Sequence, residues 1–99
     1  MTTLLADVYK KAYGDDFVAE RIVSMSPENV QIKRMIRTLL YKQGRASLRQ
    51  IAEAEATITG KKPPVSSAIH NSIHKDDYMV RYPDIYEDIN DIIIDVFSF

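Results

Sequence analysis

The stretch SPENVQIKRMIRTLLYKQGRASLRQ, residues Ser26–Gln50, decides the fold. Ser26 is a typical N-cap, Pro27 suits the first helical position, and Glu28 favours the positive end of a helix dipole. The apolar residues that follow recur at the helical period: Ile32, Met35, Ile36, Leu39 and Leu40. We therefore predict an amphipathic helix that starts at Pro27 and is ended by Gly44. Its cations are expected elsewhere on the surface: Lys33, Arg34, Arg37 and Lys42.

A second helix begins almost at once. Ser47-Leu48-Arg49-Gln50 has the spacing of a capping box, in which the Ser and Gln side chains each bond the other residue's free backbone N–H group. Only Gly44-Arg45-Ala46-Ser47 joins the two helices, so the connection is a sharp turn and not a linker. This arrangement predicts a helix-turn-helix.

A third helix is predicted downstream of a turn-rich connection. Residues 56–64 hold the turn formers, and Thr57-Ile58-Thr59 is a candidate extended segment. A helix is predicted to start near Pro63 or Pro64, since a first helical turn tolerates proline. Its part from Val65 to Lys75 carries apolar or small residues at helical spacing: Val65, Ala68, Ile69, Ser72 and Ile73. Residues 78–82 alternate and are rich in β-formers, so we predict a short strand that Pro83 ends.

Both ends of the chain carry apolar periodicity of their own. A helix is predicted from Thr3 to Tyr13, and a second one after a cap at Asp15 or Asp16. Residues 83–99 fit a helical stripe and also have a strand-like composition, and we favour the helix. The apolar surplus at the two ends either wraps the central core or forms a homodimer interface.

Length and composition indicate one mainly α-helical domain. Its 99 residues divide into an N-terminal helical extension (1–25), a helix-turn-helix core (26–82) and a C-terminal helix or strand (83–99). There is no cysteine, which excludes disulfides and thiol chemistry. Neither a signal-peptide pattern nor a long apolar run is found, so we expect a cytoplasmic location. No phosphate loop, dinucleotide motif or nucleophile elbow is present, and we expect no enzyme activity and no cofactor.

Charge is segregated along the chain although the net charge is only −1. Residues 32–62 carry eight Lys and Arg against two Glu, and residues 76–99 carry seven Asp and Glu against one Arg. One interpretation is that these charges are spread over solvated helix faces. The other is a basic footprint for phosphates, with an acidic end held away from it.

The helix predicted from Val65 to Lys75 is the best candidate for a binding element. With its apolar stripe buried, its other face would display hydrogen-bonding side chains that can read base edges or hold phosphates: Ser66, Ser67, His70, Asn71, His74 and Lys75. Four cations are expected to flank this face: Arg45, Arg49, Lys61 and Lys62. No Asp or Glu lies between Ala56 and Lys75, whereas a solvated helix face usually mixes charges of both signs.

The two histidines and the C-terminal carboxylates are two further patterns, and neither predicts a functional site. His70 and His74 are spaced i, i+4 and could share a metal ion with Asp76 or Asp77, but no third His exists and the HExxH pattern is missing, so we predict no metal site. The C-terminal carboxylates would form ladders on a helix, which is most simply a solvated face: Asp84, Glu87, Asp88, Asp91 and Asp95.

Residues 32–82, read as helix, tight turn, helix, loop, helix and strand, resemble the winged helix-turn-helix family. The most similar part is GKKPPVSSAIHNSI, residues 60–73, followed by Tyr78-Met79-Val80-Arg81, which looks like a recognition helix leading to a wing. No Gly-rich hairpin follows Arg81, so the wing is expected to be rudimentary or absent. The resemblance implies a double-stranded DNA-binding transcriptional regulator that reads the major groove with residues 65–75, as a homodimer with recognition helices about 34 Å apart.

A different class of function fits the same scaffold. The near-zero net charge and the acidic C-terminal third favour a protein-interaction module, a small adaptor or phage-type inhibitor that uses a helix-turn-helix without binding DNA.

Overall fold

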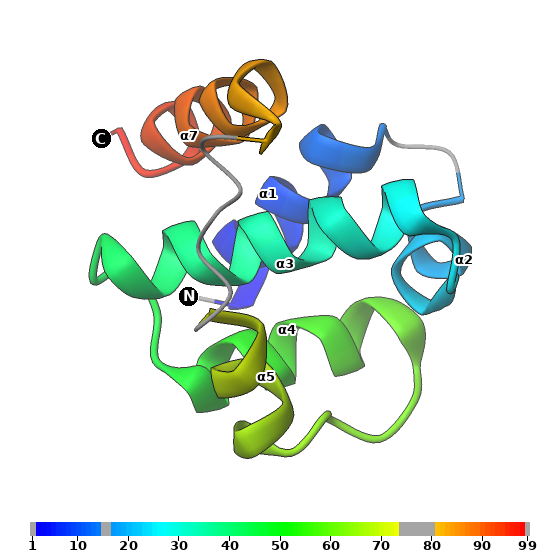
Figure 1. The fold of residues 1–99 in the computed structure, drawn as a ribbon. Coiled ribbons are helices and arrows are strands. Elements are labelled where there is room, and N and C mark those ends of the chain that lie inside the picture. The colour runs from blue at the N-terminus through cyan, green and yellow to red at the C-terminus, as the bar shows by residue number, and fades with distance from the viewer. Residues whose placement is uncertain (1, 15–16, 74–80, 99) are drawn as a thin grey trace.

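The computed structural model describes residues 2–14, 17–73 and 81–98, and within them it contains helices and no strand. The described helices are α1 (Thr2–Tyr13), α2 (Val18–Val23), α3 (Pro27–Lys42), α4 (Leu48–Thr59), α5 (Ser66–Ile73) and α7 (Pro83–Val96) (Figure 1). The expected mainly α-helical class is thus confirmed. The strand predicted over residues 78–82 lies mostly outside the described residues, as do the predicted caps Asp15 and Asp16.

Helix α3 runs through the middle of the molecule, with α7 on one side and α5 on the other (Figure 1). Helix α5 packs against α3 and α4, while α7 packs against α1 and α3. Each of these helices contributes fully buried side chains to one core. They are Leu5, Val8 and Tyr9 from α1, Met35, Ile36 and Leu40 from α3, Ile51 from α4, Ile69 from α5 and Ile93 from α7. The apolar stripe predicted for α3 is confirmed by this burial.

The turn between α3 and α4 has the predicted hydrogen bonds. Gln50 N donates to Ser47 Oγ (3.2 Å) and Ser47 N donates to Gln50 Oε1 (2.9 Å), which confirms the capping box. Gly44 has a φ of 67° and Arg45 N donates to Leu40 O, so the chain reverses within five residues after Lys42. At the start of α3, Pro27 occupies the first turn as predicted, but the Ser26 side chain forms no capping bond.

The extended segment considered for residues 57–59 is wrong, because α4 continues to Thr59. The hydroxyls of Thr57 and Thr59 donate to the carbonyls of Glu53 and Glu55 one turn earlier, both at 2.9 Å, so these β-branched residues are accommodated within the helix. Gly60 ends α4 with a φ of 71°, a left-handed conformation that glycine adopts without steric cost.

The terminal segments are helices that wrap the central core. The predicted N-terminal helix is confirmed as α1, and the helix favoured for the C-terminal segment is confirmed as α7, which excludes the strand alternative. Burial of Leu5, Val8, Tyr9 and Ile93 accounts for part of the apolar surplus within one chain. None of the helices among the described residues has the length and apolar character that a bilayer crossing requires.

Candidate nucleic-acid interface

The outer face of α5 is polar and exposed. Ile69, Ser72 and Ile73 face the core, and the exposed positions include four of the predicted binding residues: Ser66, Ser67, His70 and Asn71. His74 and Lys75, predicted for the same face, lie outside the described residues. Helix α5 begins at Ser66, so the predicted start near Pro63 or Pro64 is wrong, and both prolines lie in the connection before the helix.

Two predicted cations lie close to the N-terminal end of α5. Arg49, Lys62 and Ser66 line one open hollow of about 490 Å³ between α4 and the connection that leads into α5. Arg49 also pairs with Glu53 one turn along α4, with 3.0 Å between Arg49 Nε and Glu53 Oε1, and its side chain is 87% exposed. The pair leaves the guanidinium accessible. Lys61 precedes Lys62 in the connection and is exposed as well.

Arg45, the fourth predicted cation, makes a contact of a different kind. Its guanidinium lies over the ring of Phe97 at 5.4 Å from the centroid, an arrangement that cation–π attraction favours. Its Nε is buried and has no hydrogen-bond partner among the described residues. The structure therefore joins Arg45 to the segment after α7 and not to the hollow that holds Arg49 and Lys62.

A cation that was not among the predicted binding residues lies beside α5. Arg34 of α3 lines a hollow of about 140 Å³ together with Ala68, Asn71 and Ser72. The available signal was its position off the apolar stripe of α3 within the basic segment 32–62. Its place in the same hollow as Asn71 depends on the packing of α5 against α3, which spacing along the chain does not reveal.

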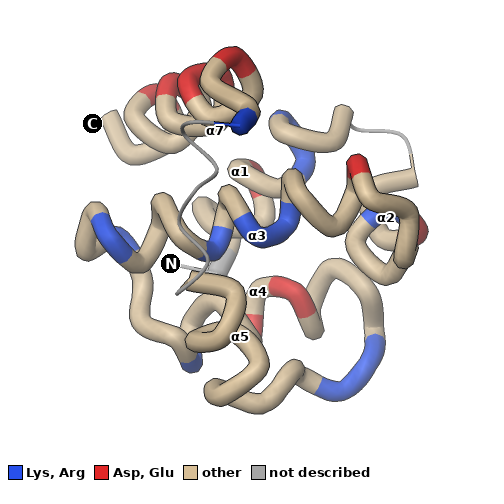
Figure 2. Tube along the Cα trace, in the orientation of Figure 1, with Lys and Arg blue, Asp and Glu red and all other residues tan. Residues whose placement is uncertain are grey.

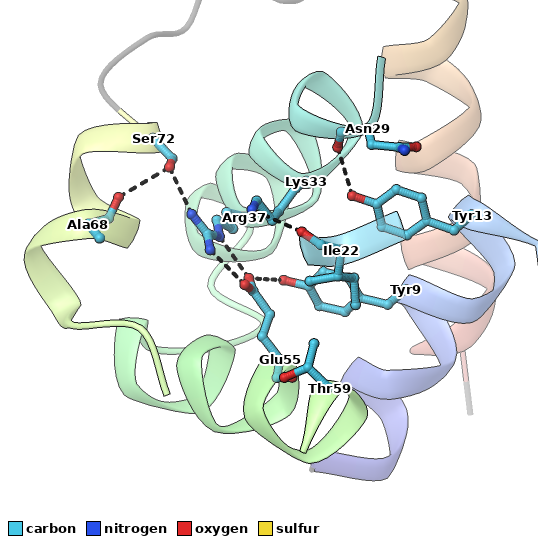
Figure 3. Close-up of polar contacts among 10 residues, drawn as sticks. All are labelled: Tyr9, Tyr13, Ile22, Asn29, Lys33, Arg37, Glu55, Thr59, Ala68 and Ser72. Carbon is cyan, nitrogen blue, oxygen red and sulfur yellow. Dashed lines mark hydrogen bonds and ion pairs between the residues drawn. The ribbon is translucent and has the colours of Figure 1, made fainter. Parts of the chain in front are cut away.

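Arg37 was expected at the surface, and the structure corrects this. It is buried, and it forms a bidentate ion pair with the buried Glu55 of α4: Nε to Oε2 at 2.7 Å and Nη2 to Oε1 at 2.6 Å (Figure 3). Helical periodicity places Arg37 next to the apolar stripe, and only the charge on a separate helix makes its burial tolerable.

The Arg37–Glu55 pair belongs to a network that reaches four helices. Tyr9 Oη of α1 donates to Glu55 Oε2 at 2.5 Å, and Arg37 Nη1 donates to Ser72 Oγ of α5 at 3.0 Å (Figure 3). Ser72 Oγ in turn donates to the carbonyl of Ala68 at 3.2 Å. These bonds hold the inner face of α5 against α3, so they orient the exposed face of the same helix.

Both partners of Glu55 keep their protons over a wide pH range. Burial, followed by the charge and hydrogen bond of Glu55, raises the pKa of Tyr9 well above its ordinary value of 10.0. For Arg37, burial acts to lower the pKa, but the hydrogen bond and the charge of Glu55 outweigh it, and the pKa is raised. Tyr9 and Arg37 therefore stay protonated at neutral pH, which keeps their hydrogen bonds to Glu55 in place.

The acidic helix lies away from α5. The carboxylates of α7 are exposed, and α7 and α5 are on opposite sides of α3 (Figure 2): Asp84, Glu87, Asp88, Asp91 and Asp95. Because α5 packs against α3 and α4 whereas α7 packs against α1 and α3, the acidic surface does not cover the polar face of α5.

No model of a known protein family matches the chain, and no curated protein sequence or solved structure matches it either.

Proposed function

We propose that this chain binds double-stranded DNA, as a small transcriptional regulator that inserts α5 into the major groove. The observation that carries the proposal is the position of cations at both ends of the exposed face of α5. Lys62 and Arg49 lie near Ser66 at its start, and Arg34 lies beside Asn71 toward its end. Cations at both ends of a polar helix can contact backbone phosphates while the helix lies in a groove.

The exposed side chains of α5 suit the chemistry of base edges. Asn71 has an amide that can pair with N6 and N7 of adenine, and the hydroxyls of Ser66 and Ser67 at the first turn can accept or donate a bond to a phosphate. Helix α5 is short, which is sufficient because major-groove helices contact bases mainly through their N-terminal residues. The lack of Asp and Glu from Ala56 to Lys75 keeps repulsion of phosphates low on this face.

Charge reversal at the connection before α5 tests the proposal. A Lys61→Glu/Lys62→Glu variant should bind all duplexes more weakly. The slope of log affinity against log salt should become less negative by about 2, because each lost phosphate contact removes about 0.9 from its magnitude. Fluorescence anisotropy with a random duplex, measured between about 50 and about 200 mM salt, gives both quantities.

A matched control is Lys10→Glu/Lys11→Glu on α1, which reverses the same number of charges and breaks the exposed Lys11–Asp95 pair. The proposal is wrong if the two double variants bind duplex DNA equally well at low salt. Asn71→Ala adds a test of recognition, since it should reduce the preference among sequences while leaving the salt slope unchanged.

A protein-interaction module remains the second candidate, and exposed apolar side chains around α2 favour it. Phe17 is 72% exposed and Met25 is 85% exposed, and Val23 between them is also exposed. Exposed apolar side chains mark a partner surface where they form one contiguous patch, and these three lie within nine residues of one another in the chain. Weak retention on heparin with no salt dependence, together with no binding to duplex DNA, would favour this candidate over the first.

A further inference from the structure

A second hollow lies on the other side of the connection that carries Lys61 and Lys62. It has a volume of about 180 Å³ and forms where the end of α2, the middle of α3 and the end of α4 meet that connection. Its polar lining comes from α3, from α4 and from the connection after α4: Lys33, Arg37, Glu55, Thr59, Lys61 and Lys62. Figure 3 shows Lys33, Arg37, Glu55 and Thr59 grouped at this point.

The charges in this hollow do not cancel. Among the residues that the structure describes, Glu55 is the acidic residue that lines the hollow, and its carboxylate is neutralised by the bidentate pair with Arg37. Three lysines remain: Lys33, Lys61 and Lys62. The C-terminal ends of α2 and α4 each contribute about half a negative charge, which leaves a balance near +2.

The ammonium groups of these lysines have more N–H donors than the hydrogen bonds they form within the described residues. Lys33 Nζ donates one bond, to the carbonyl of Ile22 at 3.1 Å, although an ammonium group has three N–H donors. Among the residues that the structure describes, the side chains of Lys61 and Lys62 form no hydrogen bond or ion pair. The hollow is thus lined by lysines from α3 and from the connection after α4 whose donors are not all used within the described part of the protein.

Lys33 carries an electrostatic cost that a bound anion would relieve. Burial, followed by the charge of Arg37, lowers the pKa of Lys33 from its ordinary value of 10.5. An anion in the hollow would offset both effects by restoring a counter-charge. The volume is well below the roughly 300 to 1,000 Å³ of sites that enclose drug-sized ligands, so a small anion fits better than a whole nucleotide.

We propose that this hollow is a binding site for a phosphate-class anion, held by Lys33, Lys61 and Lys62. The anion is either a free phosphate group or a phosphate of bound DNA, since both present the same charged oxygens. The site does not require that α5 read DNA, because Lys33 lies on α3 and the hollow does not include the exposed face of α5.

The test is a titration of the full chain with inorganic phosphate at fixed ionic strength, followed by ¹H–¹⁵N NMR. Saturable shifts are expected at the amides around Ile22 and in residues 59–62, which border the hollow. Lys33→Met should weaken phosphate affinity about tenfold, the loss expected for one charge-assisted hydrogen bond, and should leave amide positions elsewhere unchanged. Lys10→Met removes an exposed lysine from α1 and should leave the affinity as it is.

The site is refuted if phosphate produces no saturable shift, or if Lys33→Met and Lys10→Met bind phosphate equally. Because this titration contains no DNA, a negative result would refute the anion site and would leave the proposed DNA binding to its own test. Anisotropy with duplex DNA then identifies the source of the anion. Displacement of DNA by saturating phosphate at constant ionic strength assigns the site to a backbone phosphate, whereas unchanged DNA binding assigns it to a free anion.

Discussion

At the scale of single residues, the Arg37–Glu55 pair is the feature with the largest energetic consequence. Both side chains are buried, with 8% and 5% of their surfaces exposed, so neither charge is compensated by water. Each therefore depends on the other and on the hydrogen bonds from Tyr9 and to Ser72. By contrast, the exposed Arg49–Glu53 pair on α4 is solvated, and such pairs contribute little to stability.

Removing one partner of the buried pair should be strongly destabilising. Glu55→Ala leaves the Arg37 guanidinium buried without a counter-charge, and we expect a loss of about 3 to 5 kcal/mol in the free energy of unfolding. Urea denaturation followed by circular dichroism measures it. Glu53→Ala on the same helix is the control, with an expected loss of about 0 to 1 kcal/mol. Equal losses for the two variants would contradict the role given to the buried pair.

The raised pKa of Tyr9 predicts a loss of stability in alkaline solution. Above pH 10.0 the unfolded chain releases the Tyr9 proton while the folded chain retains it, so the folded state binds more protons and stability falls as the pH rises. Tyr9→Phe removes this contribution. Folding lowers the pKa of Lys33, so this lysine acts in the opposite direction and adds stability as the pH rises. Because the wild-type chain and Tyr9→Phe both contain Lys33, its effect cancels in the difference between them.

The measurement is the difference in unfolding free energy between the wild-type chain and Tyr9→Phe, at about pH 8 and about pH 11. At the lower pH the wild type should be more stable by about 1.5 to 3 kcal/mol, the value of a hydrogen bond to a charged group. The difference should shrink at the higher pH. A constant difference would mean that Tyr9 keeps its ordinary pKa.

At the scale of elements, the end of α4 sets the position of the lysine pair. Gly60 adopts a left-handed conformation and its N–H donates to Ala56 O, and the chain then leaves the helix through Lys61 and Lys62. Apart from Gly60 and its two chain neighbours, no described residue has an atom within 4 Å of the position that a Cβ at Gly60 would occupy, so the main cost of a larger residue is conformational. This connection borders both hollows, so its geometry affects both proposed sites.

Gly60→Ala should destabilise the protein by about 1 to 2 kcal/mol, the cost of a left-handed conformation for a residue with a Cβ. Gly60→Asn should cost less, because Asn adopts this conformation more readily. Thermal unfolding of the two variants compares them directly. If Gly60→Ala proved as stable as wild type, the left-handed end of α4 would be wrong.

At the scale of the whole molecule, the segregated charges become two opposed surfaces. The acidic residues of α7 and the cations around α5 lie on opposite sides of a molecule that measures 33 × 32 × 26 Å (Figure 2). The Debye length is about 8 Å at 150 mM salt and about 30 Å at 10 mM, so the two surfaces influence each other's ligands only at low salt.

Neutralising α7 should therefore change DNA binding only at low ionic strength. We expect a Glu87→Gln/Asp88→Asn/Asp91→Asn variant to bind duplex DNA more tightly than wild type at about 10 mM salt and equally at about 150 mM. Anisotropy titrations at the two concentrations give the comparison. Tighter binding at both concentrations would indicate that α7 lies closer to the DNA than its place opposite α5 allows.

Much of the fold was predictable because its signals are local. The capping box at Ser47 and Gln50, the proline at the start of α3 and the 3.6-residue stripes each depend on residues within a few positions of one another. The same holds for the exposed polar face of α5, whose periodicity alone placed Ser66, Ser67, His70 and Asn71 outside the core. The end of α4 was less predictable, since Thr57 and Thr59 disfavour helix by propensity and are accommodated by bonds to carbonyls one turn earlier.

The sequence by itself determined the helices, the sharp turn and the separation of charge along the chain, because chain-local geometry and composition contain that information. Only the tertiary structure decided which charges are buried and which converge. Arg37 is buried because Glu55, on another helix, forms an ion pair with it. Arg34 lies beside Asn71 because α5 packs on α3. Burying a charge requires a partner in space, and no spacing within one helix reveals a partner on another.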